Sequence, residues 1–151
     1  MKKNIRISTF ETNSSSIHSI VISSEGLEPS NLPMDNDGNI LVEYGTFDKE
    51  GDFNSQIDKL SYLITQCYYL GGFGGWDDCL DPDVNYHFDH VREAILDYVK
   101  DAHDIKVIGG EPDIDHQSIP DYELNLVNEW DKTSIQDFVF NKFVTLHCDI
   151  D

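Results

Sequence analysis

The chain has 151 residues, 39% of them apolar, and its 29 acidic residues against 10 lysines and arginines give a formal net charge of −19. This charge disfavours direct binding to nucleic acid or to an anionic membrane, and it favours basic proteins and cations as partners. The apolar content is sufficient for a single acidic globular domain over residues 1–151 and argues against disorder.

The start of the chain and its cysteines are typical of a cytoplasmic protein. No apolar segment follows the basic residues 1–6, so a secretory signal is not expected. The uncharged run over residues 60–76 is interrupted by glycines and is shorter than the ~20 apolar residues of a membrane helix. The three cysteines are widely spaced, which suits reduced thiols, and Cys67 and Cys148 lie on apolar faces that predict burial.

Strands are expected first along the chain. Residues 4–9 and 17–22 are β-prone, and the turn signal at 35–39 leads into a strand at 40–44. The same turn has the third, fifth and sixth positions of a calcium-binding loop. Pro33 and Tyr44 would then occupy its first and twelfth positions, where carboxylates are required, so a plain hairpin turn is predicted.

Helical spacing of apolar residues follows in two segments. These residues are Ile57, Leu60, Ile64 and Cys67 or Tyr68 in the first, and Phe88, Val91, Ile95 and Val99 in the second. Strands are predicted at 104–108 and 122–127, and Thr133 with Gln136 resembles a capping box that opens a helix through Asn141. Residues 144–150 alternate as a final strand. The pattern predicts an α+β fold, a single domain with a mostly antiparallel sheet and about three helices.

The glycine-rich residues 71–75 do not fit a phosphate-binding loop. Lysine and a hydroxyl residue would follow such glycines, whereas Trp76, Asp77 and Asp78 follow here. An anion would be repelled, so we expect a flexible loop that presents Phe73 and Trp76 to a partner protein, with Asp77 and Asp78 as further partner-binding residues.

The histidines raise the question of a metal. His87 and His90 share a helical face, and Asp113, Asp115 and His116 offer further ligands, but no third ligand has a diagnostic spacing. We therefore expect neither a dedicated metal site nor a cofactor, beyond weak Mg²⁺ or Ca²⁺ binding to the acidic residues.

A serine-rich string is the most unusual local feature. Ser14, Ser16 and His18 would project to one side of an extended chain, where a hydroxyl and an imidazole can act as nucleophile and base. His116 lies in a second polar cluster that a sheet could bring close. The alternative is a turn built by side-chain to backbone hydrogen bonds, with His18 as an ordinary strand residue.

The string Phe-Glu-Thr-Asn-Ser-Ser-Ser-Ile-His-Ser at residues 10–19 resembles the N-terminal signature of small uncharacterised proteins of bacteriophages and prophages. The resemblance implies a phage-type origin and a bacterial host cytoplasm. It implies no mechanism.

Two classes of function remain. In the favoured one, acidic rows at Asp113 with Asp115 and at Asp121 with Glu123 imitate a phosphate backbone, since alternate strand residues lie ~6.6 Å apart. The protein would then occupy the basic nucleic-acid site of a host nuclease or CRISPR effector, as small acidic phage inhibitors do, without binding nucleic acid or membrane itself. The alternative is a small hydrolase or group transferase that uses the Ser14, Ser16 and His18 cluster. The sequence leaves the oligomeric state open.

Overall fold

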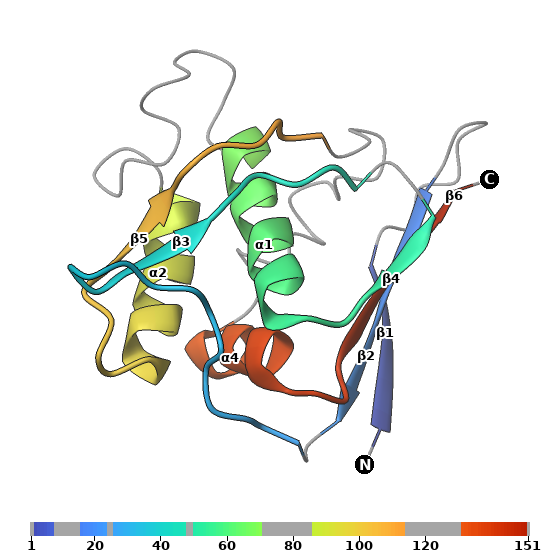
Figure 1. The fold of residues 1–151 in the computed structure, drawn as a ribbon. Coiled ribbons are helices and arrows are strands. Elements are labelled where there is room, and N and C mark those ends of the chain that lie inside the picture. Colours follow the sequence, from blue (N-terminus) through green and yellow to red (C-terminus); the bar gives the residue numbers. More distant parts are fainter. Residues whose placement is uncertain are drawn as a thin grey trace.

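The computed structural model describes residues 2–7, 16–23, 26–47, 50–70, 86–113 and 131–150. Within these ranges the chain forms strands and helices that alternate without a simple repeat (Figure 1). The strands are β1 (Lys2–Ile7), β2 (Ser16–Ser23), β3 (Asn39–Val42), β4 (Gly51–Phe53), β5 (Asp104–Val107) and β6 (Thr145–Ile150). The helices are α1 (Gln56–Leu70), α2 (Tyr86–Tyr98) and α4 (Lys132–Phe140).

The strands form two small sheets. One has four strands in the order β1-β2-β6-β4, all antiparallel, and the other pairs β3 with β5 in parallel. In Figure 1 helices α1 and α4 lie between the two sheets, and α2 packs beside β5. The fold within the described ranges is therefore α+β, as expected, but the sheets are small and one of the two is parallel.

The predicted elements at 40–44 and 104–108 are strands that pair with each other in parallel, and Ile40 also forms an antiparallel bridge with Met34 across the turn before β3. Ile40 lies opposite Ile105, and backbone hydrogen bonds continue the pairing beyond both strands, so residues 43–47 run beside residues 108–113. The turn before β3 is formed as predicted, because the Asp35 carboxylate accepts hydrogen bonds from two backbone N–H groups of the turn. The predicted strand at 122–127 lies outside the described residues.

The helix predicted from Thr133 begins earlier. Asp131 is its N-cap, and the Asp131 side chain accepts a hydrogen bond of 2.8 Å from Ser134 N. The proposed capping box at Thr133 and Gln136 is therefore wrong, since Gln136 Nε2 donates to Ala94 O of α2 instead. An aspartate at the N-cap also suits the positive end of the helix dipole.

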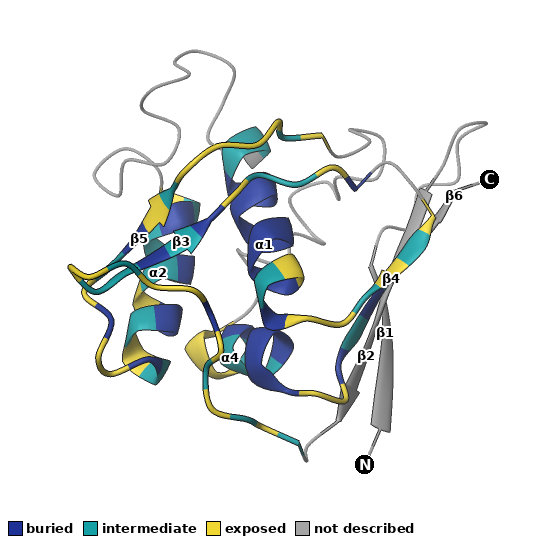
Figure 2. Ribbon diagram, in the orientation of Figure 1, coloured by how far each residue is buried: buried dark blue, intermediate teal, exposed yellow. Residues whose placement is uncertain are grey.

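Helix α1 is central rather than superficial. Figure 2 shows it buried along most of its length. The buried residues include polar ones, which the spacing of the apolar residues would place on an exposed face. Thr65 Oγ1 donates to Ser61 O (2.7 Å), and Gln66 Nε2 donates to the Tyr62 hydroxyl (3.0 Å). The most unusual is Lys59, whose Nζ donates to Asn141 O (2.9 Å) and Val144 O (3.2 Å) just after α4. These hydrogen bonds allow polar groups in the core.

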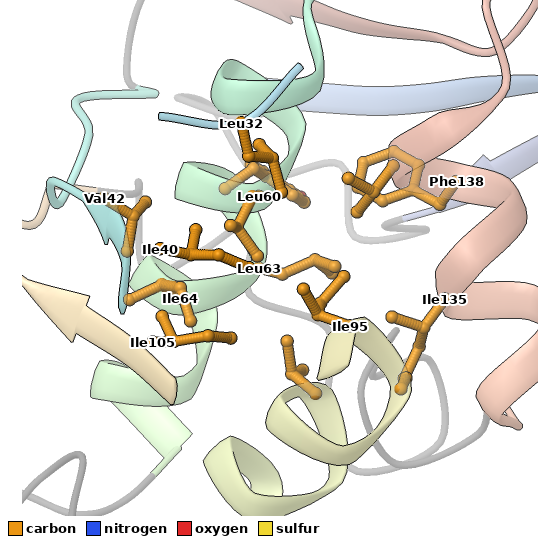
Figure 3. Packing of buried hydrophobic residues seen from close by; sticks show 14 of the residues in the cluster. Leu32, Ile40, Val42, Leu60, Leu63, Ile64, Ile95, Ile105, Ile135 and Phe138 are labelled. Atoms are coloured by element: carbon orange, nitrogen blue, oxygen red, sulfur yellow. The ribbon is translucent and has the colours of Figure 1, made fainter. Parts of the chain in front are cut away.

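The core joins all three described helices to both sheets. Figure 3 shows Leu60 and Leu63 of α1 between Ile40 on one side and Phe138 on the other, with Ile64 of the same helix beside Ile105. The tail alternates as predicted: Val144, Leu146 and Cys148 are fully buried, whereas Thr145 and His147 are half-buried. Cys67 and Cys148 are both buried, as expected. None of the helices in the described ranges combines the length and apolar character needed to cross a bilayer.

Candidate functional site

Most residues that the sequence singles out lie outside the described ranges. These are Ser14, Trp76, Asp77, Asp78, Asp115, His116, Asp121 and Glu123. Ser16 and His18 lie on β2, where their backbones pair with Ile150 and Cys148 of β6. Asp113 is described at the end of the segment that follows β5.

The strand that carries His18 also brings together a set of residues that the sequence did not indicate. In the register of the larger sheet, Ser19 of β2 lies opposite His147 of β6, and Asp52 of β4 lies opposite the same histidine on its other side. The Nδ1 atom of His147 contacts Oδ1 of Asp52. A serine, a histidine and an aspartate therefore occupy one row across three adjacent strands.

Cys148, the described neighbour of His147 on β6, adds no reactive thiol to this row. Cys148 follows His147, but burial raises the pKa of its thiol to about 12, so it is protonated at neutral pH and a poor nucleophile. The His147 and Asp52 side chains are both more than 40% exposed, with side-chain values of 44% and 59%. Both side chains of the pair are therefore accessible to solvent.

Within the described ranges the two histidines of α2 are not part of a group of metal ligands. His87 and His90 are half-buried on α2, and the His90 ring stacks on Tyr86 with an interplanar angle of 5°. Among the described residues no three His, Cys, Asp or Glu side chains are grouped so that they could hold a metal ion.

A pocket of about 430 Å³ lies between the segment after β3 and the first turns of α1. Three groups of residues line it: a continuous segment that we call the pocket wall, a set of apolar residues from other segments, and residues of α1. They are Leu41 to Phe47 in the wall, Pro33, Phe53 and Ile108 among the apolar residues, and Ile57, Asp58 and Ser61 on α1.

Hydrogen bonds hold the pocket wall against α1. Ser61 Oγ donates to Glu43 O (2.6 Å), and Gly45 N donates to Thr65 Oγ1 (3.0 Å). The position of Gly45 leaves no room for a side chain, because a Cβ there would lie 2.5 Å from the Phe47 ring. On the far side of the wall Gly110 has φ +86°, and a Cβ there would collide with the Tyr44 backbone. The wall is thus fixed on both sides.

The pocket carries negative charge only. Glu43 and Asp58 are its charged lining residues, and no lysine, arginine or histidine lines it. The ion pairs within the described ranges lie elsewhere, and among those made by lysine or arginine the shortest joins Arg92 to Asp104 (2.7 Å). Asp113, which the sequence predicted as a partner-binding residue, is exposed beside this wall, since Phe47 N donates to its carbonyl (2.6 Å).

Sequence reasoning missed Glu43 and Asp58, although one signal for the first was present. Residues 8–47 contain no lysine or arginine, so any acid in the segment after β3 lacks a local cation. The pairing of that segment with α1 depends on tertiary structure and leaves no mark in sequence spacing.

Comparison with known proteins adds no family to these observations: no protein-family model, no curated protein and no solved structure matches this chain.

Proposed function

We propose that the protein is a phage-type acidic binding module that inhibits a host nucleic-acid-binding or defence protein, of the nuclease or CRISPR-effector class, by occupying its basic nucleic-acid site. The observation that supports this most is the negatively charged pocket with Asp113 beside it. Besides the overall charge of −19, the protein thus has a local acidic surface that includes apolar lining residues.

The charge is placed where a partner can reach it. Glu43, Asp58, Glu111 and Asp113 are all exposed, and no lysine or arginine among the described residues forms an ion pair with Glu43, Asp58 or Glu111. A surface that binds DNA or RNA uses arginine and lysine to neutralise phosphates, and the same side chains can pair with carboxylates. The apolar lining residues of the pocket would supply contacts that a phosphate backbone lacks, so the mimic could bind more tightly than nucleic acid does.

Reversal of the acidic row tests this proposal. Substituting lysine for Asp113, Asp115, Asp121 and Glu123 is expected to abolish capture of a basic partner from a bacterial lysate. Capture by the unaltered protein should also fall steeply as salt rises, because exposed charges are screened beyond ~8 Å at physiological ionic strength. DNA or RNA should compete for the captured partner.

A control variant separates local from total charge. Lysine substitutions at Asp89, Glu93, Asp97 and Asp101, on and just after α2, change the net charge by the same amount and should leave capture largely intact. Capture that ignores both salt and nucleic acid, or an equal loss in the two variants, contradicts mimicry.

The row of Ser19, His147 and Asp52 favours a second candidate, a small hydrolase or group transferase. The sequence placed this activity on Ser14, Ser16 and His18, whereas the strand register puts Ser19 opposite the histidine that contacts an aspartate. In such an enzyme His147 would take the Ser19 hydroxyl proton as Oγ attacks the substrate, and would return it to the leaving group.

A fluorophosphonate probe, which labels activated serines and releases fluoride, distinguishes these residues. If the row is catalytic, Ser19→Ala abolishes labelling and His147→Ala slows it by at least ~100-fold, as expected for loss of a general base. Ser16→Ala is the matched control, because Ser16 pairs with Ile150 and not with His147, and this variant should label normally. Absence of labelling in the unaltered protein would eliminate this candidate.

A further inference from the structure

The pocket is lined by aromatic rings and by two acidic residues. The rings of Phe47 and Phe53 meet edge to face with centroids 5.1 Å apart, and Ile57 is partly buried against the core beside them. Glu43 and Asp58 lie among these side chains as the charged lining residues. A ligand that fits this lining must be apolar along its length and positively charged at one end.

We propose that the pocket binds the side chain of an arginine from a basic segment of the partner, an inference that rests on the proposed function in taking the partner to be a basic protein. The three methylenes of arginine can lie on apolar walls while the guanidinium reaches a carboxylate. Its planar group is weakly hydrated, stacks on aromatic rings and donates two parallel hydrogen bonds to one carboxylate. Lysine carries a compact, strongly hydrated charge that stacks less well, so arginine suits these walls better.

Size and rigidity agree with a ligand site. The volume of about 430 Å³ lies within the range of roughly 300 to 1,000 Å³ that is typical of pockets for small ligands. It accommodates an arginine side chain together with part of its neighbours. Because Ser61 and Thr65 fix the wall to α1 by hydrogen bonds, binding does not have to order that wall first.

A second hollow shows that volume alone does not define the site. It measures about 540 Å³ and is lined by residues of the segment after Gly26 and by the end of α2 with the turn that follows. Lys100 lines it together with Glu28 and Asp101, so its charge is mixed and a cation is less favoured there. This hollow provides an internal control for the first.

Three pentapeptides test the proposal. They differ only in their central residue, and glycine and serine occupy the flanking positions. The central residue is arginine, lysine or citrulline, which has nearly the shape of arginine but no charge. Binding is followed by amide chemical-shift titration of the full chain at low salt. The arginine peptide should shift the amides of residues 43–47 and Ser61, and citrulline should weaken binding at least ~10-fold, because the charge-assisted hydrogen bonds are lost.

Paired variants assign the effect to the pocket. Glu43→Gln with Asp58→Asn should weaken the arginine peptide at least ~10-fold, while Glu93→Gln with Asp101→Asn, which removes the same charge elsewhere, should change it less than ~3-fold. Both acids of the first pair are exposed, so the variant is expected to fold, and a thermal melt checks this. Equal binding of citrulline, or an equal loss in the control pair, overturns the arginine site.

The pocket and the proposed function fail in different ways. A protein that binds no arginine peptide, yet captures a basic partner in competition with DNA, refutes the pocket alone. A protein that binds the peptide at residues 43–47, yet captures no partner in competition with nucleic acid, refutes the proposed function and retains the pocket.

Discussion

Replacing Tyr62 by alanine is expected to lower the free energy of unfolding by about 3 to 5 kcal/mol, the range for removing a buried aromatic ring. Tyr62 is fully buried in α1. Its ring meets Phe47 edge to face at 5.0 Å and Phe138 at 6.4 Å, so it joins the pocket wall to α4 through the core. The loss would be a large part of the ~5 to 15 kcal/mol that stabilises a typical domain.

Urea denaturation of Tyr62→Ala and Tyr62→Phe separates packing from hydrogen bonding. The phenylalanine variant keeps the ring and loses only the hydroxyl that accepts from Gln66 Nε2, so it should cost about 1 to 2 kcal/mol. A Tyr62→Ala variant that loses less than the phenylalanine variant would show that the ring contributes nothing to packing and that the described core is incorrect.

The second large effect concerns Lys59 and alkaline pH. Burial lowers the pKa of this amine from 10.5 to about 8, although the charges of Asp137 and Glu28 offset part of the shift. Between these two values the unfolded chain holds the proton and the folded chain does not. The stability contributed by Lys59 therefore rises with pH from about 8 to 10.5, by about 3 kcal/mol in total, because each pKa unit corresponds to ~1.4 kcal/mol.

Loss of the proton from the Lys59 amine leaves the structure around this residue intact. A neutral amine still has two N–H donors, which match the two carbonyl oxygens of Asn141 and Val144. The measurement is urea denaturation of the unaltered protein and of Lys59→Met at several pH values from about 7 to 10.5. Tyrosines and cysteines titrate in both proteins, so the difference between the two isolates Lys59. That difference should grow in favour of the unaltered protein, and a constant difference would mean that the amine keeps its ordinary pKa.

Both predictions bear on the pocket as well as on stability. Tyr62 contacts Phe47, a residue of the pocket wall, and Lys59 lies next to Asp58, which lines the pocket. Tyr62→Ala should therefore weaken binding of the arginine peptide together with stability, whereas Glu43→Gln should weaken binding alone. This contrast distinguishes residues that shape the pocket from residues that contact its ligand.

Sequence patterns with a short range determined the elements of the fold. The three-to-four-residue spacing of Leu60 and Ile64 places α1, and the alternation of Leu146 and Cys148 places β6. The turn before β3 forms because the Asp35 carboxylate bonds to backbone groups two and four residues on. Each of these signals acts within a few residues, so each can be recognised without knowing the rest of the chain.

Where two local signals competed, the prediction failed by a small margin. Thr133 with Gln136 three residues on fits a capping box, but Asp131 is a residue type that caps helices equally well, and it is the N-cap of α4. The Gln136 side chain donates to Ala94 O on another helix, so it does not form the capping box. Strand β4 was missed because three residues beginning with glycine carry too little propensity, and pairing with β6 is what orders them.

The sequence by itself thus determined the charge, the α+β class and the positions of the helices, since these follow from composition and local periodicity. Only the tertiary structure decided that β3 pairs with β5 in parallel, that Lys59 is buried against the residues just after α4, and that Glu43 and Asp58 line one pocket. Each of these depends on contacts between segments far apart in the chain. Such contacts are set by how the whole core packs, and no spacing rule within a single segment records them.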